Sequence, residues 1–352
     1  MLVFHLLLII FEEVNTKPLI LSIESSCDDT SVAILKGRKV LSNIVSTQKV
    51  HKDFGGVVPE LASRAHQKNI VPTVDVAVKT AGIKLAELDA IAFTVGPGLL
   101  GSLLVGVSFA KSMALGLGIP LITVNHMEAH ILAHFIDSDK QAPSFPFICL
   151  TVSGGHTQLV EVKSPYQFEI HGETIDDAAG EAFDKIAKIM GLPYPGGPVL
   201  DKLAQDGNPL AFKFSLPKVG NYDYSFSGLK TSVLYFLQKE MKLNSAFIEE
   251  NKNDLCASVQ KAILDVLFVK LDLLVEELGI KQIAVAGGVS ANSGLRSRLE
   301  TKRKVGWSVY LPDFEYCTDN AAMIGIGGYY KFLKQDFAEI SIAAQARLKI
   351  TK

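Results

Sequence analysis

The chain has 352 residues, of which 48% are hydrophobic and 20% charged, a composition that excludes an intrinsically disordered protein and is long enough for two domains. Its formal net charge is −2, so the overall charge neither supports nor excludes RNA, which would need a local basic patch or a partner protein. The four cysteines, at positions 27, 149, 256 and 317, have no paired spacing, which argues against a disulfide framework or a four-cysteine zinc site and fits a reducing compartment.

The chain begins with an apolar stretch, residues 1–11, followed by polar and charged residues up to Lys17. This stretch has no basic flank, no small-residue cleavage site and too few residues to span a bilayer. We therefore predict that residues 1–17 form an N-terminal extension and not a targeting or membrane segment.

The rest of the sequence repeats one plan twice. Residues 19–35 and residues 147–162 both read as strand, polar turn, strand. Residues 90–98 and 282–290 are apolar strands that end in a glycine turn before a helix. Such self-similarity indicates duplication. We expect one lobe over residues 18–145, a second over 146–318, and a helix at 319–335 that packs on the first lobe.

A duplicated α/β unit that begins with a polar-turned hairpin is typical of the two-lobed actin-like ATPase fold of sugar kinases, heat-shock chaperones and actin. Two RNase H-like lobes then enclose a central cleft, and the turns at 25–30 and 153–157 face each other and hold phosphates through backbone N–H groups. The alternative is a pair of ordinary tight hairpins. Neither turn is a Walker loop, because each leads into a strand and lacks the Gly-Lys-Ser ending.

Residues 59–82 have the pattern of a helix that begins at Pro59, with Glu60 and Arg64 four residues apart. Its apolar residues fall near helical spacing. This helix either packs on its own lobe or offers a surface to a partner.

Residues 125–130 (Asn-His-Met-Glu-Ala-His) place His126 and His130 four residues apart, so both imidazoles of one helix face can reach a single ion. We interpret His134 as a surface residue on the same stripe. Glu128 lies about 200° around the helix from His126 and points away from such an ion, which disfavours a metalloprotease. Glu128 is therefore expected to be a solvated helix residue.

Residues 176–191 begin with acidic residues and end with glycine, which predicts a helix. Its apolar residues at helical spacing predict a buried face, and Asp184 within that run should face a cleft or a partner. The turn at 192–198 contains glycines that let backbone approach a ligand. Asp201 beyond it could contact a ribose hydroxyl or be a solvated surface residue.

Residues 287–292 follow a β-branched strand and begin a helix, so Asn292 could meet an adenosine or simply cap that helix. Residues 317–322 begin a helix of small residues that contains Gly325, Gly327 and Gly328. Asp319 reads as its N-cap, or as a third metal ligand if this helix packs on the first lobe.

Nine blocks of the chain, in this order, closely resemble the TsaD family of tRNA N6-adenosine threonylcarbamoyltransferases, once labelled Gcp or O-sialoglycoprotein endopeptidase. The resemblance extends from about Leu19 to the helix after Asp319, and so many ordered blocks are highly specific. The blocks are residues 23–30, 55–66, 125–130, 153–157, 176–185, 194–198, 226–231, 287–292 and 317–322.

The resemblance implies that His126, His130 and Asp319 bind one divalent metal ion per chain, described as iron or zinc. It further implies that the cleft holds an ATP- or AMP-type nucleotide. The residues implied to bind the adenylate are Thr151, Val152, Ser153, Gly154, Gly155, Asp184, Gly197, Asp201 and Asn292. No position in these sets departs from the family pattern, and the form of residues 317–322 resembles bacterial members.

The implied reaction transfers a threonylcarbamoyl group from threonylcarbamoyl-adenylate to the N6 amine of the adenosine 3′-adjacent to the anticodon, in tRNAs that read codons beginning with A. AMP is released. By motif and chemistry, Asp28 is the candidate for accepting a proton from the amine or orienting it. Alternatives are a two-lobed ATPase or sugar kinase, a metalloprotease, and a binding protein without catalysis.

Family members in bacteria act with a TsaB-like partner and a TsaE-like ATPase, so the resemblance implies these partners, tRNA, a cytoplasmic location and no membrane. Because the net charge is −2, we expect weak tRNA binding by this chain alone. A local patch would have to come from Lys213, Lys218, Lys230, Arg296 and Arg298.

Overall fold

A computed structural model describes residues 16–217 and 219–350 of the chain. The N-terminal extension expected over residues 1–17 therefore falls outside the described residues except for its last two. The strands are β1 (Leu19–Glu24), β2 (Thr30–Lys36), β3 (Lys39–Ser46), β4 (Ala90–Gly96), β5 (Leu121–Asn125), β6 (Phe147–Val152), β7 (Thr157–Ser164), β8 (Gln167–Glu173), β9 (Gln282–Ala286) and β10 (Ser308–Tyr310).

Two five-stranded sheets share one topology. The first has the order β3-β2-β1-β4-β5 and the second β10-β9-β6-β7-β8, which is the same order when β1 is matched to β6. In both, the first three strands are antiparallel and the last two join in parallel, with β1 beside β4 and β6 beside β9. The duplication predicted from the repeated strand–turn–strand pattern is therefore confirmed.

Ten α-helices are seen in the described residues, in segments whose apolar residues recur at helical spacing. They are α1 (Pro59–Ala81), α2 (Leu100–Leu117), α3 (His126–Leu132), α4 (Ala179–Ile189), α5 (Gly196–Ala204), α6 (Ser227–Leu243), α7 (Phe247–Glu250), α8 (Lys252–Leu278), α9 (Ser293–Arg303) and α10 (Ala321–Leu333). Short 3₁₀ helices, η1 to η5, lie at Lys49–Phe54, Leu85–Glu87, Ala133–Phe135, Gly288–Ala291 and Phe314–Tyr316.

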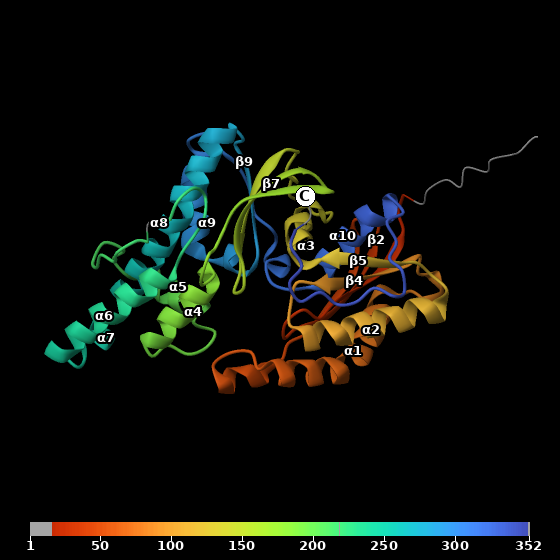
Figure 1. Cartoon of the computed structure of the whole chain (residues 1–352), viewed down its shortest axis with the longest axis horizontal. Helices are drawn as coiled ribbons and strands as arrows, with labels where there is room; N and C mark the ends of the chain where they lie inside the picture. The colour runs from red at the N-terminus through yellow and green to blue at the C-terminus, as the bar shows by residue number, and fades with distance from the viewer. Residues whose placement is uncertain (1–15, 218, 351–352) are drawn as a thin grey trace, which may run out of the picture.

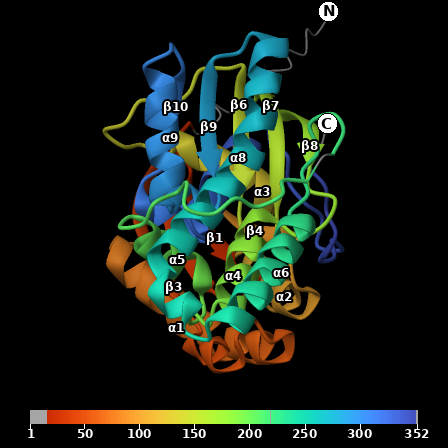
Figure 2. The ribbon, with the colours of Figure 1, turned by 90° about the vertical axis from the view of Figure 1, so that its left-hand side faces the viewer.

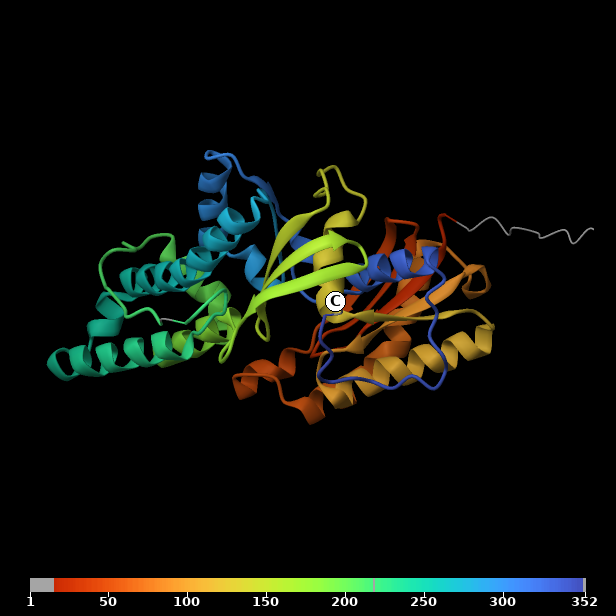
Figure 3. The ribbon, with the colours of Figure 1, turned by 45° about the horizontal axis from the view of Figure 1, so that its top comes forward.

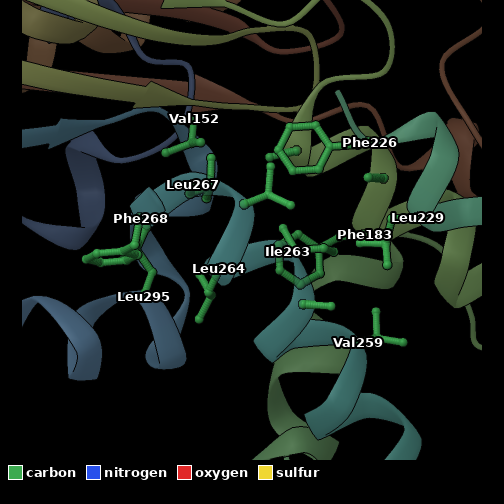
Figure 4. Packing of buried hydrophobic residues seen from close by; sticks show 14 of the residues in the cluster. Val152, Phe183, Phe226, Leu229, Val259, Ile263, Leu264, Leu267, Phe268 and Leu295 are labelled. Carbon is green, nitrogen blue, oxygen red and sulfur yellow. The ribbon is translucent and has the colours of Figure 1, made fainter. Parts of the chain in front are cut away.

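Three hydrophobic cores hold the layers together. The helices α1 and α2 pack on the outer face of the first sheet, and α3 and α10 lie on its other face (Figure 1). The helices α4, α5, α6, α8 and α9 pack on the outer face of the second sheet, as Figure 2 shows. Figure 4 shows that core from within, where Phe183 of α4 and Ile263 of α8 contribute to one apolar cluster.

The third core lies between the sheets and contains α3 and α10 (Figure 3). The small residues of α10 allow it to lie directly on the first sheet. A Cβ added at Gly325 would lie 2.3 Å from Leu35 Cδ1, and one at Gly328 would lie 2.6 Å from Ala92 Cβ. Glycine is needed at both positions because α10 approaches β2 and β4 so closely. This close packing places the residues before α10 beside α3.

One described helix, α2, is long and apolar enough to cross a membrane by length and composition alone. It connects β4 to β5, and its buried residues Val107, Ala110 and Ala114 pack in the core of the first sheet. A helix that covers a sheet passes the same test of composition.

Candidate active site and metal centre

A cleft of about 1120 Å³ lies where the two polar turns meet. Its walls come from both halves of the chain. They comprise residues 26–29, 55–57, 97–99, 153–156 and 192–194, together with His126, Glu181, Asp184, Lys185, Lys188, Gly196, Gly288, Thr318 and Asp319. The turns predicted to face each other therefore border one cavity, with the helix pair α3 and α10 at its base.

The two histidines of α3 and the aspartate before α10 converge at this cleft. The Nε2 atom of His130 lies 3.1 Å from Oδ1 of Asp319, and Nε2 of His126 lies 3.5 Å from the same oxygen. One possible ligand atom from each residue lies within 4.8 Å of the other two. His130 is buried, whereas His126 and Asp319 also line the cleft.

The N-caps of α3 and α10 are asparagines, which leaves the side chains of His126 and Asp319 free to face each other. Asn125 caps α3 by accepting a hydrogen bond from Met127 N at 2.9 Å, so His126 stands in the first turn of the helix. Asn320 caps α10 by accepting from Met323 N at 3.1 Å. The N-cap role considered for Asp319 thus belongs to Asn320, and the carboxylate of Asp319 points instead at the imidazoles.

Glu24 is a site residue that the sequence reading missed. It ends the buried strand β1, and its Oε2 accepts a hydrogen bond from Nδ1 of His126 at 3.0 Å and another from the Thr94 hydroxyl. Burial acts to raise the pKa of Glu24, but the charge and hydrogen bond of His126 hold this pKa below its ordinary value. The signal in the sequence was a carboxylate at the end of an otherwise apolar strand, where a buried charge needs a partner.

The pKa values of His126 and Asp319 are shifted because their side chains are close together and shielded from water. Burial acts to lower the pKa of His126, but Asp319 and Glu24 together raise this pKa well above its ordinary value. Burial acts to raise the pKa of Asp319, and His126 and His130 hold it well below the usual range. Two imidazoles and one carboxylate thus share a compact, strongly polarised site.

The donor set fits a divalent transition metal. Two imidazole nitrogens and a carboxylate oxygen are three protein ligands, and the cleft leaves a further position open. The bond from His126 Nδ1 to Glu24 fixes the tautomer that presents Nε2 to Asp319, the arrangement usual behind a metal-binding histidine. The Nδ1 atom of His130 is buried and makes no hydrogen bond with the described residues.

Two expectations about α3 and the following η3 were wrong. His134, in η3, is only partly exposed: its Nε2 donates to Val285 O at 3.0 Å, and burial lowers the pKa of His134 to about 4. Glu128 is only 7% exposed and is not solvated. Both differences arise because α3 lies between two sheets, so it has no solvent-facing side of the kind assumed from its spacing.

The first turn carries three ionisable side chains into the cleft, those of Cys27, Asp28 and Asp29. Burial raises the pKa of the Cys27 thiol, and burial together with the charge of Asp28 raises the pKa of Asp29 to about 7. All four cysteines lie within the described residues and none forms a disulfide.

The second turn is closed by its own hydrogen bonds. Ser153 N donates to His156 O at 2.8 Å, and His156 N donates to Ser153 Oγ at 3.0 Å. A Cβ added at Gly154 or Gly155 would meet nothing within 4 Å, so the backbone here borders open space in the cleft. Such a backbone can approach an anionic ligand closely.

The predicted adenylate residues do not all line the cleft. Ser153, Gly154, Gly155 and Asp184 do, and Asp184 Oδ1 accepts a hydrogen bond from Gly197 N at 2.8 Å. Burial raises the pKa of Asp184. By contrast, the side chains of Thr151 and Val152 are fully buried within β6.

Asp201 and Asn292 are engaged in local structure. Asp201 is partly exposed and accepts hydrogen bonds from Ser293 N and, at 2.7 Å, from Ser293 Oγ. Asn292 caps α9 by accepting from Leu295 N at 2.8 Å, and its Nδ2 donates to Gln260 Oε1. Asp201 of α5 thus contacts the first residue of α9, and Asn292, five residues after Gly287, caps the same helix.

Asp176 was expected at the start of α4, which begins at Ala179. Its carboxylate instead accepts hydrogen bonds from Phe226 N at 2.8 Å and from both Ser225 and Ser227 hydroxyls, at the start of α6. Asp176 thus caps α6 and not α4, because the fold brings the start of α6 next to Asp176.

The predicted basic patch is largely occupied by internal contacts. Arg296 donates to Ser290 O at 2.8 Å, Arg298 pairs with Asp265 at 2.6 Å, and Lys230 lies 3.6 Å from Asp177. Lys213 is exposed, and Lys218 lies outside the described residues. The basic residues that line the cleft are Lys185 and Lys188 of α4, which the sequence reading did not select.

Comparison with known proteins identifies the family. Residues 39–326 match the family model TsaD, tRNA N6-adenosine threonylcarbamoyltransferase. The chain is 61% identical over 332 residues to the tRNA N6-adenosine threonylcarbamoyltransferase of Christiangramia forsetii, covering 94% of this chain and 98% of that protein. It is 60% identical to that of Riemerella anatipestifer, with the same two coverages. The chain belongs to the TsaD family.

Solved structures of lower identity show the fold. Full-length HypF in its phosphate- and nucleotide-bound form matches with a TM-score of 0.60 at 15% identity, over 90% of this chain and 47% of that one. Component A of (R)-2-hydroxyglutaryl-CoA dehydratase from Acidaminococcus fermentans matches with a TM-score of 0.52 at 15% identity, over 90% and 98%. The actin-like ATPase fold predicted from the sequence is thereby confirmed.

Family membership settles the class of reaction. The chain is an acyltransferase that adds threonylcarbamoyl to the N6 amine of adenosine in tRNA, as its TsaD relatives are named. The sugar-kinase and metalloprotease alternatives are set aside, although the kinase-like fold is retained.

Proposed function

We propose that the cleft binds threonylcarbamoyl-adenylate beside one divalent metal ion held by His126, His130 and Asp319. The observation that carries the proposal is the convergence of these three side chains, from α3 and from the start of α10, at the base of the cavity between the two polar turns. Iron and zinc both suit this imidazole and carboxylate donor set. When bound, the metal would supply Lewis-acid polarisation of the substrate.

The chain's own residues have positioning and proton-transfer roles. The donor is a mixed anhydride of a carbonyl group and a phosphate, so it is already activated, and the protein must bring the N6 amine to the carbonyl and stabilise leaving AMP. We assign Asp28, in the first turn, to orient the amine or accept its proton. Glu24 holds His126 in the required tautomer.

The second turn would hold the phosphate. Its Gly154 and Gly155 backbone borders open cleft, where N–H groups can meet an oxyanion. The adenosine would lie on the same side, against Asp184 and the Gly196–Gly197 corner. Thr151 and Val152 would support this subsite from within β6, and Asp201 and Asn292 from the junction of α5 and α9.

In our proposal the protein partners and the tRNA have separate sites, the partners on α1 and the tRNA at the cleft. The helix α1 has an exposed side that carries Val71, 59% exposed, and Val76, 45% exposed. We propose that it takes a TsaB-like partner, with a TsaE-like ATPase completing a cytoplasmic assembly. Lys188 at the cleft would meet tRNA phosphates, whereas Lys185 beside it already pairs with Asp177 at 2.7 Å and Glu181 at 2.8 Å.

Mass spectrometry of tRNA nucleosides tests the proposal. Cells depleted of this chain should lose N6-threonylcarbamoyladenosine and regain it with the wild-type chain. An Asp319→Ala chain should not restore it. Restoration by Asp319→Ala at wild-type level would contradict the proposed metal centre while leaving the family assignment in place.

A further inference from the structure

Side chains of α1 and α2 form hydrogen bonds with the turn at residues 25–30. His66 of α1 is fully buried, with Nε2 2.9 Å from Cys27 O and Nδ1 2.8 Å from the Thr30 hydroxyl oxygen. Ser102 of α2 donates its hydroxyl to the same Cys27 carbonyl at 2.9 Å. The turn that lines the cleft is thus joined to helices on the outer face of the first sheet.

The protonation of His66 follows from its partners. A carbonyl can only accept, so Nε2 carries the proton and donates to Cys27 O. Nδ1 then has a lone pair that accepts from the Thr30 hydroxyl. Burial lowers the pKa of His66, which keeps the ring in this neutral form. Both nitrogens are used, and together they fix the ring in one orientation.

These two contacts bracket the pair Asp28 and Asp29. The Cys27 carbonyl precedes the pair and the Thr30 side chain follows it, while both aspartates line the cleft. The Cys27 carbonyl already accepts a hydrogen bond from Ser102, so His66 is not required to satisfy an otherwise unpaired acceptor. His66 adds a second contact, to the Thr30 hydroxyl on the C-terminal side of the two aspartates, and this contact fixes the orientation of the turn that carries them.

We propose that His66 is a positioning residue for threonylcarbamoyl transfer, which holds the 27–30 turn so that Asp28 meets the reacting amine. This inference rests on the role proposed above for Asp28.

Four variants test the inference in the complete assembly. Thr30→Val removes the hydroxyl that Nδ1 accepts from, and His66→Leu removes both contacts. His66→Gln keeps a donor that can reach Cys27 O. Thr73→Val is the matched control, because Thr73 lies on α1, is 5% exposed, and bonds only its own helix at Asn69 O.

The readouts are the single-turnover rate at saturating donor and the KM for tRNA. Displacing the turn should slow transfer by about tenfold or more in His66→Leu and Thr30→Val, because reactive geometry tolerates little misplacement. The KM for tRNA should stay within about twofold, since no tRNA contact is removed. His66→Gln should recover part of the rate, and Thr73→Val should match the wild type.

A double-mutant cycle separates this inference from the role of Asp28. If the contacts of His66 act through Asp28, Thr30→Val should slow an Asp28→Asn enzyme little further. A wild-type rate in Asp28→Asn with a slow His66→Leu would remove the role of Asp28 and leave the positioning of the turn by His66 standing. A wild-type rate in Thr30→Val, with a slow Asp28→Asn, would overturn the inference even if His66→Leu failed to fold.

Discussion

The Nδ1 atom of His126 lies 3.0 Å from Oε2 of Glu24, whose side chain is 1% exposed. Because the other ring nitrogen faces Asp319, one imidazole connects a carboxylate of β1 to the residue that begins α10. Two segments nearly 300 positions apart in the sequence are thus connected through a single ring.

The first prediction concerns this connection. Glu24→Gln should weaken metal binding by roughly 10- to 100-fold, because the carboxylate orients His126 and increases its basicity. Metal retained after dialysis against graded chelator measures the effect. Asp265→Asn is the control, since Asp265 pairs with Arg298 at 2.6 Å between α8 and α9, away from the cleft. Equal metal retention in the two variants would contradict the role of Glu24.

The second prediction separates the two roles of Asn292. Asn292→Ser should keep the cap of α9, because serine is also a good N-cap, while removing the amide that a bound adenosine could meet. AMP should raise the Tm of the wild-type chain by binding the native state, and raise it less in Asn292→Ser. An unchanged shift would leave Asn292 as a helix cap alone.

The third prediction concerns acid stability and His134. The unfolded chain binds a proton at His134 below about pH 6.5, whereas burial lowers the folded pKa to about 4, so stability falls as the pH drops through this window. His134→Gln cannot take up this proton. The difference in free energy of unfolding between His134→Gln and the wild type should therefore shift by about 2 kcal/mol in favour of the variant when the pH is lowered from 7.5 to 5. Urea denaturation at both pH values measures the difference, and a constant difference would count against the burial effect.

The fourth prediction concerns the partner and tRNA. The isolated chain should bind tRNA weakly and in a salt-sensitive manner, and transfer slowly, with both improved by a TsaB-like partner. Val71→Glu on the exposed side of α1 should remove the improvement and leave the basal rate unchanged. Tyr235→Glu on α6, at a site that is 65% exposed, should retain the improvement. Partner-independent multiple turnover would contradict the dependence.

The fold and the grouping of His126, His130 and Asp319 could be predicted because their signals are local or repeated. Two strand–turn–strand patterns predict the duplication, and the four-residue spacing of His126 and His130 predicts a shared helix face. Asp319 could be named only on the condition that its helix packs on the first half, a condition met through the small residues of α10.

The rest depends on tertiary contacts that spacing does not reveal. The spacing predicts a solvated Glu128 and a surface His134, because a helix pattern does not show that sheets cover both sides of α3. Glu24 was passed over because its partner lies 102 positions away. Asp176 caps a helix that begins 51 positions later, a distance at which capping patterns give no signal.

The central claim is that transfer takes place at the cleft and requires the centre formed by His126, His130 and Asp319. The direct measurement uses purified chain with its partners, unmodified tRNA and threonylcarbamoyl-adenylate, and determines bound metal and N6-threonylcarbamoyladenosine in the same samples. For His130→Ala, the account predicts a folded chain in which bound metal and modified nucleoside fall together. Wild-type formation of the modified nucleoside by metal-free His130→Ala would contradict it.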